Sequence, residues 1–403
     1  MSKSRTFAWM AWVIASLFYA YQYVLRVMPN IMMDSIIEQF NIDVVTFGQF
    51  SGVYYIGYSL MHLPIGMLLD RFGPKKIMPF FILMTVVGLL PIIFADSWVY
   101  PIIGRLLIGM GSSAAILSTF KIIRLYFTEE KFTRMLSFSV TIGLIGAIYG
   151  GGPVNYLFGV LGYKIVVELF VLLGLILAVF AYFAVPTIKL DHPSTITSDI
   201  KEVFSNGKVI FICLCAGLMV GPMEGFADVW GTGFLKQVYG LEGTVAASLP
   251  SLIFVGMCFG GPILSVIAEK TNRYLGTIIV AGILMVFGFV FLVEGQMDIR
   301  SMSVMFALIG MCSAYQIIAI YKASTYVKEH VVGLTTAIAN MIIMVFGYLF
   351  HTIIGWVVHF MGGPNDALAY VKGITVIPVA LVLGVLGFCI LVSWEKIKKN
   401  KSV

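Results

Sequence analysis

The sequence has few charged residues and none of the compact motifs that mark a catalytic site. Only 11% of its 403 residues are Asp, Glu, Lys or Arg, whereas 60% are hydrophobic. This composition excludes a soluble globular enzyme and indicates a chain surrounded mostly by lipid. A Walker motif, a catalytic triad and an H-E-x-x-H sequence are also absent, so we expect neither an ATP-driven pump nor an enzyme.

Cysteine is scarce as well, and its positions argue against disulfides and metal sites. The five cysteines are Cys213, Cys215, Cys258, Cys312 and Cys389. All lie in apolar stretches without the spacing of metal ligands, so we expect small core residues and no cofactor or metal. The first apolar run, from about Thr6, lacks a small-residue cleavage site and is expected to be the first membrane helix rather than a signal peptide.

Long apolar segments occupy nearly the whole chain, and each is long enough for a membrane span of about 20 residues. The expected helices cover residues 7–33, 45–68, 76–95, 98–126, 135–160, 164–186, 208–237, 245–268, 274–294, 299–327, 334–360 and 369–393. The one long hydrophilic interior stretch separates the sixth helix from the seventh. The sequence therefore predicts an all-α integral membrane protein of 12 transmembrane helices in two six-helix bundles. The expected units are residues 1–188, a cytoplasmic linker at 189–207, and residues 208–403 with a short basic tail.

Two motifs recur in the second half of the chain at nearly the same offset. Residues 107–112 (LIGMGS) reappear at 308–313 (LIGMCS), and the same register pairs Lys121 with Lys322. Residues 66–76 have a weaker echo at 265–273, where a small residue, an acid, a base and a turn former follow in the same order. Two matches in one register predict two similar halves, as in transporters built from repeats.

The stretch 66–76 (GMLLDRFGPKK) joins two apolar segments and has the composition of a short basic hairpin. It resembles the loop between helices 2 and 3 of the major facilitator superfamily, whose pattern is G-x-L-x-D-R-x-G-x-K/R-K/R, with Pro74 as a small departure. The resemblance covers essentially the whole chain and implies a fold of two pseudo-symmetric bundles. It also implies that this loop and its echo form a gate on the inner side. The expected gating residues are Gly66, Asp70, Arg71, Gly73, Glu269 and Lys270.

Basic residues indicate how the chain is oriented in the membrane. Most of the 26 Lys and Arg residues fall in loops and ends on the side of the two termini. Only Lys164, Lys236, Arg300 and Lys372 fall in the opposite loops. Because cytoplasmic loops are enriched in Lys and Arg, we expect a multi-pass protein of the cytoplasmic (inner) membrane with both termini in the cytoplasm.

Helix 1 carries a polar stripe at helical spacing, made of Tyr19, Gln22, Tyr23, Arg26 and Asn30. An arginine that faces lipid at this depth costs on the order of several kcal/mol, so Arg26 is expected to face the protein interior or a watery cavity. Residues 23–26, with Pro29 beyond, resemble helix 1 of organic-anion and sugar-phosphate members of the superfamily. In those members an arginine at this place holds an anionic group of the substrate.

Helix 7 carries two acids one turn apart, Glu224 and Asp228. The offset between the halves maps Arg26 to about 225–227, between these acids. One interpretation is an ion pair that holds the outer side closed. The other is a substrate site for a carboxylate or zwitterion, in which a protonatable acid serves as the coupling group. The two are compatible, because a substrate can compete for the same charges.

Five further ionisable residues have alternative interpretations. Residues 105–111 resemble the superfamily's R-x-x-x-G-x-G pattern, whose arginine is linked to proton movement. Alternatively, the glycines pack helices and Arg105 reaches the outer interface. One interpretation of Lys121 and Lys322 is a role in anion binding or inner gating. The other is that each side chain snorkels to the cytoplasmic interface. For His351 and His62, one interpretation is a proton relay, and the other is a hydrogen-bonded residue of the core. Tyrosines on helices 1 and 2, among them Tyr54, Tyr55 and Tyr58, are expected to line a cavity.

We therefore identify the chain as a member of the major facilitator superfamily, a secondary transporter that works by alternating access. The expected substrate is a small organic anion or zwitterion such as a carboxylate, amino acid or peptide-like molecule, moved by proton symport. The alternatives are an exporter or antiporter of amphipathic compounds and a membrane receptor that does not transport. A monomer in the lipid bilayer is expected, with no nucleic-acid partner. Expected substrate-binding residues are Arg26, Tyr19, Gln22, Tyr23, Lys121, Glu224, Lys322 and Gln316, and expected proton-coupling residues are Glu224, Asp228, Arg105 and His351.

Overall fold

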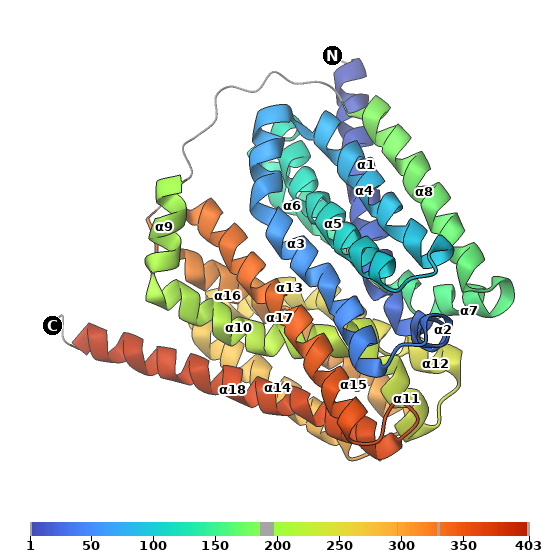
Figure 1. The fold of residues 1–403 in the computed structure, drawn as a ribbon. Coiled ribbons are helices and arrows are strands. Elements are labelled where there is room, and N and C mark those ends of the chain that lie inside the picture. The colour runs from blue at the N-terminus through green and yellow to red at the C-terminus, as the bar shows by residue number, and fades with distance from the viewer. Residues whose placement is uncertain (1, 186–196, 296, 329–330, 401–403) are drawn as a thin grey trace.

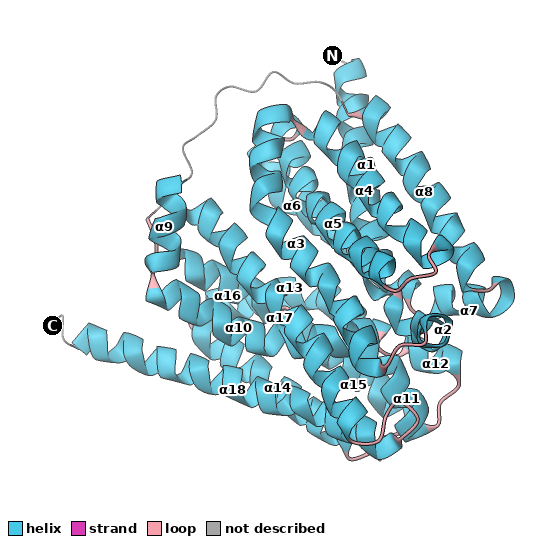
Figure 2. Cartoon of the chain, viewed as in Figure 1, coloured by secondary structure: helices cyan, strands magenta, loops and turns pink. Residues whose placement is uncertain are grey.

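The described residues form helices and short connections, with no strand among them (Figure 2). The structure is a computed structural model, and it describes residues 2–185, 197–295, 297–328 and 331–400. Eleven of its helices are long and apolar enough to span a membrane. Another long helix, α3 (Val44–Phe72), packs against α5 and α17 and supplies the twelfth expected span. The predicted all-α membrane fold is confirmed.

The first half of the chain forms the helices α1 to α8. Their bounds are α1 Ser2–Val27, α2 Pro29–Phe40, α3 Val44–Phe72, α4 Pro74–Phe94, α5 Val99–Tyr126, α6 Glu129–Gly150, α7 Gly152–Leu161 and α8 Tyr163–Ala184. The expected hairpin is the turn between α3 and α4. Gly73 has φ of 74° there, a value that favours glycine, and Pro74 opens the next helix without needing an N–H partner.

The second half forms α9 to α18 with one π-helical turn, η1. Their bounds are α9 Thr197–Ser205, α10 Gly207–Gly225, η1 Phe226–Trp230, α11 Gly231–Tyr239, α12 Gly243–Ser248, α13 Ser251–Thr271, α14 Tyr274–Val293, α15 Ile299–Ser313, α16 Tyr315–Ser324, α17 Val332–Phe360 and α18 Ala367–Asn400. The helix α9 lies within the expected linker, whose residues 189–196 fall outside the described residues.

Several spans that the periodicity predicts as single helices are divided in the structure. The first ends at Val27 because Pro29 has no N–H to continue the helical bonding, and α2 begins at that proline. The fifth is divided at Gly151, ahead of Gly152 and Pro153. Periodicity alone does not locate these breaks, since the apolar pattern continues across them.

The helices of the two halves gather into two groups, α1–α8 and α10–α18 (Figure 1). The start of α1, the end of α18 and α9 lie toward one side of the assembly, here called the terminal end, and the groups diverge toward it (Figure 1). The groups meet through α3 with α17, α6 with α13, α7 with α12, and α2 with η1 and α11. The interface between the halves is therefore concentrated away from the terminal end.

Glycines allow close approach of α3 and α17 in the part of the interface that is tightly packed. A methyl group at Gly48 would lie 2.6 Å from the carbonyl oxygen of His351, and one at Gly52 would lie 2.9 Å from the Cα of Tyr348. Toward the terminal end, α3 and α17 diverge (Figure 1). The two helices thus lie backbone to backbone at one end and separate at the other.

Candidate functional site

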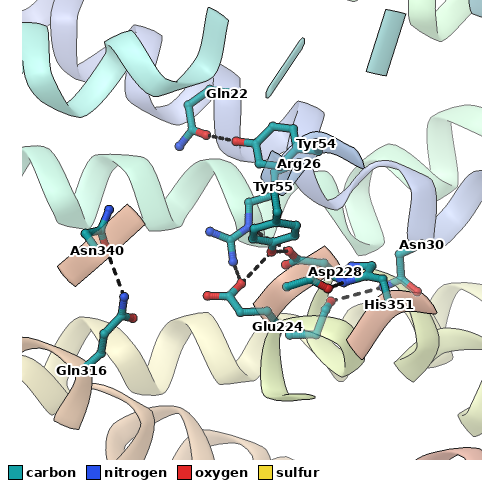
Figure 3. Close-up of polar contacts among 12 residues, drawn as sticks. Gln22, Arg26, Asn30, Tyr54, Tyr55, Glu224, Asp228, Gln316, Asn340 and His351 are labelled. Carbon is teal, nitrogen blue, oxygen red and sulfur yellow. Dashed lines mark hydrogen bonds and ion pairs between the residues drawn. The ribbon is translucent and has the colours of Figure 1, made fainter. Parts of the chain in front are cut away.

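The charged centre of the interface is Arg26, near the end of α1 (Figure 3). Its guanidinium forms ion pairs with Glu224 from α10 and with Asp228 from η1, and the Arg26 Nε to Asp228 Oδ2 distance is 2.7 Å. The side chains are 9%, 4% and 1% exposed, respectively. One cation of the first half is therefore shared by two carboxylates of the second half, in a site almost closed to solvent.

Aromatic rings surround this ion pair. The guanidinium carbon of Arg26 lies 5.1 Å from the ring centre of Tyr23 and 5.3 Å from that of Tyr55, within the range of cation–π attraction. The Tyr55 hydroxyl is within hydrogen-bond reach of both Glu224 (2.9 Å) and Asp228 (Figure 3). Tyr55 thus links α3 of the first half to both acids of the second half.

Arg105 of α5 is buried and does not reach an interface with the membrane surface. Its Nη1 donates to the carbonyl oxygen of Leu25 at 2.6 Å, and its Nη2 donates to that of Arg26 at 2.8 Å. Pro29 has no N–H for the Leu25 carbonyl four residues earlier, so the guanidinium supplies the missing donor. The expectation that Arg105 reaches the outer interface is wrong. Arg105 instead caps the end of α1, which carries Arg26.

The expected packing role of the glycines in 105–111 agrees with the structure. A methyl group at Gly109 would meet the carbonyl oxygen of Tyr54, and one at Gly111 would meet that of Phe81. These contacts bring α5 against α3 and α4. The close packing holds Arg105 beside Tyr54, whose ring centre lies 4.8 Å from the guanidinium carbon.

His351 of α17 lies next to the charged centre but outside its hydrogen bonds. Its ring centre is 5.3 Å from that of Tyr55, and its Nδ1 donates to the carbonyl oxygen of Gly347 at 2.6 Å. The backbone carbonyl of His351 accepts from Trp230 Nε1 at 3.2 Å. His62 of α3 instead contacts Ser113, with 3.1 Å between Nδ1 and Oγ.

Asn30, the last polar residue of the helix 1 stripe, also crosses the interface. Its Nδ2 donates to the carbonyl oxygen of Ala227 at 3.5 Å, and its Oδ1 accepts from the backbone N–H of Thr232 at 3.3 Å (Figure 3). Arg26 and Asn30, one turn apart on the same face, thus both bind the segment around η1. Nearer the surface, Lys236 lies 3.4 Å from Asp34 across the same interface.

The remaining expected substrate residues lie at increasing distance from Arg26. Gln22 accepts from the Tyr54 hydroxyl at 2.6 Å, within the first half. Tyr19 is half-buried and stacks edge-on with Tyr23, with ring centres 5.2 Å apart. Gln316 of α16 donates to Asn340 of α17 at 3.4 Å, on the opposite side of the space between the halves (Figure 3).

Lys322 lies on α16 near the terminal end and does not contact the Arg26 centre. Its Nζ is 2.9 Å from Glu395 of α18 and 5.0 Å from the ring centre of Tyr326. The Tyr326 hydroxyl also bonds to Glu395. Lys121, its counterpart in the first half, is half-buried on α5. The proposed roles of both lysines in substrate binding stay predictions.

The Lys322–Glu395 pair allows its structural role to be separated from a substrate role. If Lys322 only ties α16 to α18, Lys322→Ala should lower transport and thermal stability by a small amount, and Glu395→Ala, which also loses the Tyr326 hydrogen bond, should lower them at least as much. A half-exposed pair of this kind contributes about 1 kcal/mol or less. Uptake by the two variants in proteoliposomes would measure this. A substrate role of Lys322 would instead make Lys322→Ala far more damaging than Glu395→Ala.

The expected gating residues lie at the terminal end, where the halves are apart. Arg71, Glu269 and Lys270 are exposed, and a side chain at Gly66 would meet no atom within 4 Å. The side chain of Asp70 lies outside the described residues. The gate that this loop and its echo are expected to form on the inner side stays a prediction.

Two residues of the site were not among the expected binding residues, namely Tyr55 and Asn30. Both belong to polar or aromatic stripes visible in the sequence, but their partners lie about 170 or more positions away, at Glu224, Asp228 and Thr232. Among the described residues, no group of three or more His, Cys, Asp or Glu side chains could hold a metal ion. The site is therefore an ionic and aromatic one.

Comparison with known proteins gives matches over most of the chain. The family model of the Major Facilitator Superfamily matches residues 11–351. The uncharacterized transporter YybO of Bacillus subtilis (strain 168) is 25% identical over 324 residues, which are 70% of this chain and 71% of that protein. The quinolone resistance protein NorB of Staphylococcus aureus (strain bovine RF122 / ET3-1) is 28% identical over 184 residues, 45% of this chain and 36% of NorB.

Solved structures of transporters have the same overall fold. A bacterial homologue of the human lysosomal transporter Spinster, in an inward-facing and occupied conformation, matches with a TM-score of 0.74 and 15% identity, covering 94% of this chain and 95% of that one. The nucleoside transporter NupG matches with a TM-score of 0.79 and 12% identity, covering 95% and 99%. At these identities the likeness shows the fold alone.

Proposed function

The chain belongs to the Major Facilitator Superfamily, and we propose that it is a secondary active transporter that moves a small organic anion or zwitterion by alternating access with proton symport. Its membrane would be the cytoplasmic one, with both termini in the cytoplasm, as the Lys and Arg distribution favours. The terminal end, where the halves diverge, would then face the cytoplasm. The family and the multi-pass architecture argue for transport rather than enzymatic chemistry.

The observation that carries this proposal is the sharing of Arg26 by Glu224 and Asp228 across the two halves. Burying three ionic groups costs free energy that a purely structural contact between apolar helices would not incur. The contact also joins elements that must separate in alternating access. A substrate carboxylate that binds Arg26 would compete with these acids, and a substrate ammonium would compensate the acid that is released.

Proton coupling is supported by the hydrogen-bond inventory of Tyr55. Its phenol has a single O–H, yet it lies within reach of both carboxylates. The phenol can donate to only one of them, so both contacts are satisfied only when the other carboxyl carries a proton.

We expect Glu224→Gln to uncouple transport from the proton gradient, because the amide cannot take up a proton and no longer neutralises Arg26. The measurement is uptake of candidate organic acids, amino acids and dipeptides into proteoliposomes with and without an inward proton gradient. Native protein should accumulate substrate only with the gradient, whereas the variant should equilibrate it. Glu242→Gln, the same change at an exposed acid, serves as the control. Accumulation by Glu224→Gln at the native level would contradict the proposal.

Export of amphipathic compounds is the second candidate function. It is supported by an apolar cavity of about 930 Å³ among α1, α6, α7 and α8, whose lining includes Tyr21, Ile145, Leu157 and Leu173. Several of these side chains face the lipid, so the cavity is accessible to an apolar solute from the bilayer. The likeness to NorB over part of the chain agrees with this function. Flux measured in everted membrane vesicles decides the direction, because an exporter accumulates its substrate inside them.

A further inference from the structure

The seventh span contains a wide turn at the position of the acidic pair. Residues Phe226–Trp230 are π-helical, and the N–H of Gly231 bonds to the carbonyl oxygen of Phe226, five residues back. A π turn accommodates one extra residue and is rare because it is less favourable than an α-helical turn. It persists only where neighbouring groups stabilise it. Asp228 lies at the centre of this turn, and Glu224 lies just before it.

The stabilising groups come from the other half of the protein. The Asn30 amide spans the turn, since it donates to Ala227 and accepts from Thr232, which are five residues apart. The Asn30 amide thus bonds to the carbonyl oxygen of Ala227 and to the N–H of Thr232, two groups that would otherwise bond to each other across a π-helical turn. Arg26 adds an ion pair to Asp228. Both contacts come from α1 and α2 and would be lost if the halves separated at this end.

Glycine at position 231 allows the close packing of the wide turn. A methyl group there would lie 2.7 Å from the Phe226 carbonyl oxygen, the same oxygen that accepts the bond from Gly231, and would also lie 3.0 Å from Cγ of Pro250. Nearly all real Cβ contacts are longer, so the turn would have to change. At Gly225, just before the turn, the nearest atom would be a flexible methyl group of Ile354 at 3.3 Å. Substitutions of Gly231 and Gly225 by alanine are therefore a matched test and control for the wide turn.

We propose that η1 is a switch of the transport cycle, held in its wide form by Asn30 while the end opposite the termini is closed, and that it narrows to an α-helical turn when this end opens. The inference rests on the proposed transport function and deepens it, because it assigns Asn30 as a positioning residue for Asp228. When the turn narrows from π-helical to α-helical, the extra residue joins the regular helix. This change would rotate α11 against α10 by about 100° and shift it by about 1.5 Å. That movement would take Asp228 away from Arg26.

The experiment measures opening of this end without substrate. The reporter is Ala247→Cys, a fully buried position on α12, which packs against α7 of the other half. The full chain in lipid nanodiscs is labelled with a membrane-impermeant maleimide, and each variant without Ala247→Cys gives the blank for the native cysteines. Asn30→Ala and Gly231→Ala are compared with Asn340→Ala, which makes the same change on α17, and with Gly225→Ala, whose added methyl group would meet only a flexible side-chain methyl of Ile354 within 3.4 Å.

We expect Asn30→Ala and Gly231→Ala each to raise the labelling rate at least about fivefold, through a larger population of the open state. Asn340→Ala and Gly225→Ala should label at the parent rate. The proposal is wrong if either test variant labels like its matched control, or if both glycine variants rise equally. Should Gly231→Ala not be recovered as folded protein, the asparagine pair decides. Labelling needs neither substrate nor proton gradient, so a failed transport assay leaves this result interpretable.

Discussion

Arg26→Ala should abolish substrate accumulation, with a loss on the order of 100-fold in uptake rate, equivalent to about 2.7 kcal/mol. The substitution leaves Glu224 and Asp228 buried without their shared cation. Removing one partner of a buried ion pair typically costs about 3–5 kcal/mol, because the remaining charge is uncompensated. We therefore also expect a lower melting temperature of the purified protein, measured together with uptake into proteoliposomes.

Two further variants make this result interpretable. Arg26→Lys keeps the charge but places it on one nitrogen of a flexible chain rather than on a planar fork, so it should pair less well with the two carboxylates and restore only part of the activity. Lys236→Ala removes another cation that crosses the same interface, but its partner Asp34 is 85% exposed, so uptake should remain near native. Native-level accumulation by Arg26→Ala would mean that the charged centre is not on the transport path.

For Arg105→Ala we expect the second largest effect, a loss of stability that is accompanied by a loss of transport. The variant leaves the carbonyl oxygens of Leu25 and Arg26 without their donors in a buried site. Hydrogen bonds to a charged group contribute about 1.5–3 kcal/mol each, so the end of α1 should fray and misplace Arg26. Thermal unfolding of the purified protein and proteoliposome uptake measure the two effects.

The matched control is Arg124→Ala, because Arg124 is an exposed arginine on the same helix. Its removal should change neither the melting temperature nor uptake by more than a small amount. Arg105→Lys distinguishes capping from proton movement: a lysine cannot span both carbonyls, so stability should fall while the pH dependence of uptake keeps its midpoint. A shifted midpoint at native stability would instead support the proton-linked interpretation of the 105–111 motif.

Much of the fold follows from local properties of the sequence. Apolar length gives the spans, and the recurrence of LIGMGS as LIGMCS gives the two halves. The same register placed Arg26 opposite the interval between Glu224 and Asp228, and the structure brings these three side chains together. An arginine at membrane depth is so costly in lipid that its direction is predictable without coordinates.

Other features of the site depend on tertiary contacts that the sequence does not encode locally. The π turn at 226–230 lies inside a stretch that the sequence predicts as one helix, 208–237, and its stabilising partner Asn30 comes from the other half. The capping role of Arg105 depends on a carbonyl that Pro29 leaves free on another helix. Lys322 shares its register with Lys121, yet its observed partner is Glu395, on a helix whose position depends on the whole second bundle.

The close packing of α3 and α5 has a consequence for how the protein is made. A methyl group at Gly57 would clash with the carbonyl oxygen of Leu106, and one at Gly109 would clash with that of Tyr54. Helices that are already in the bilayer associate through such backbone contacts, because lipid tails leave no hydrophobic force to bring them together. Mutations at Gly57 or Gly109 would therefore be expected to act on the assembly of the first bundle before they act on the finished carrier.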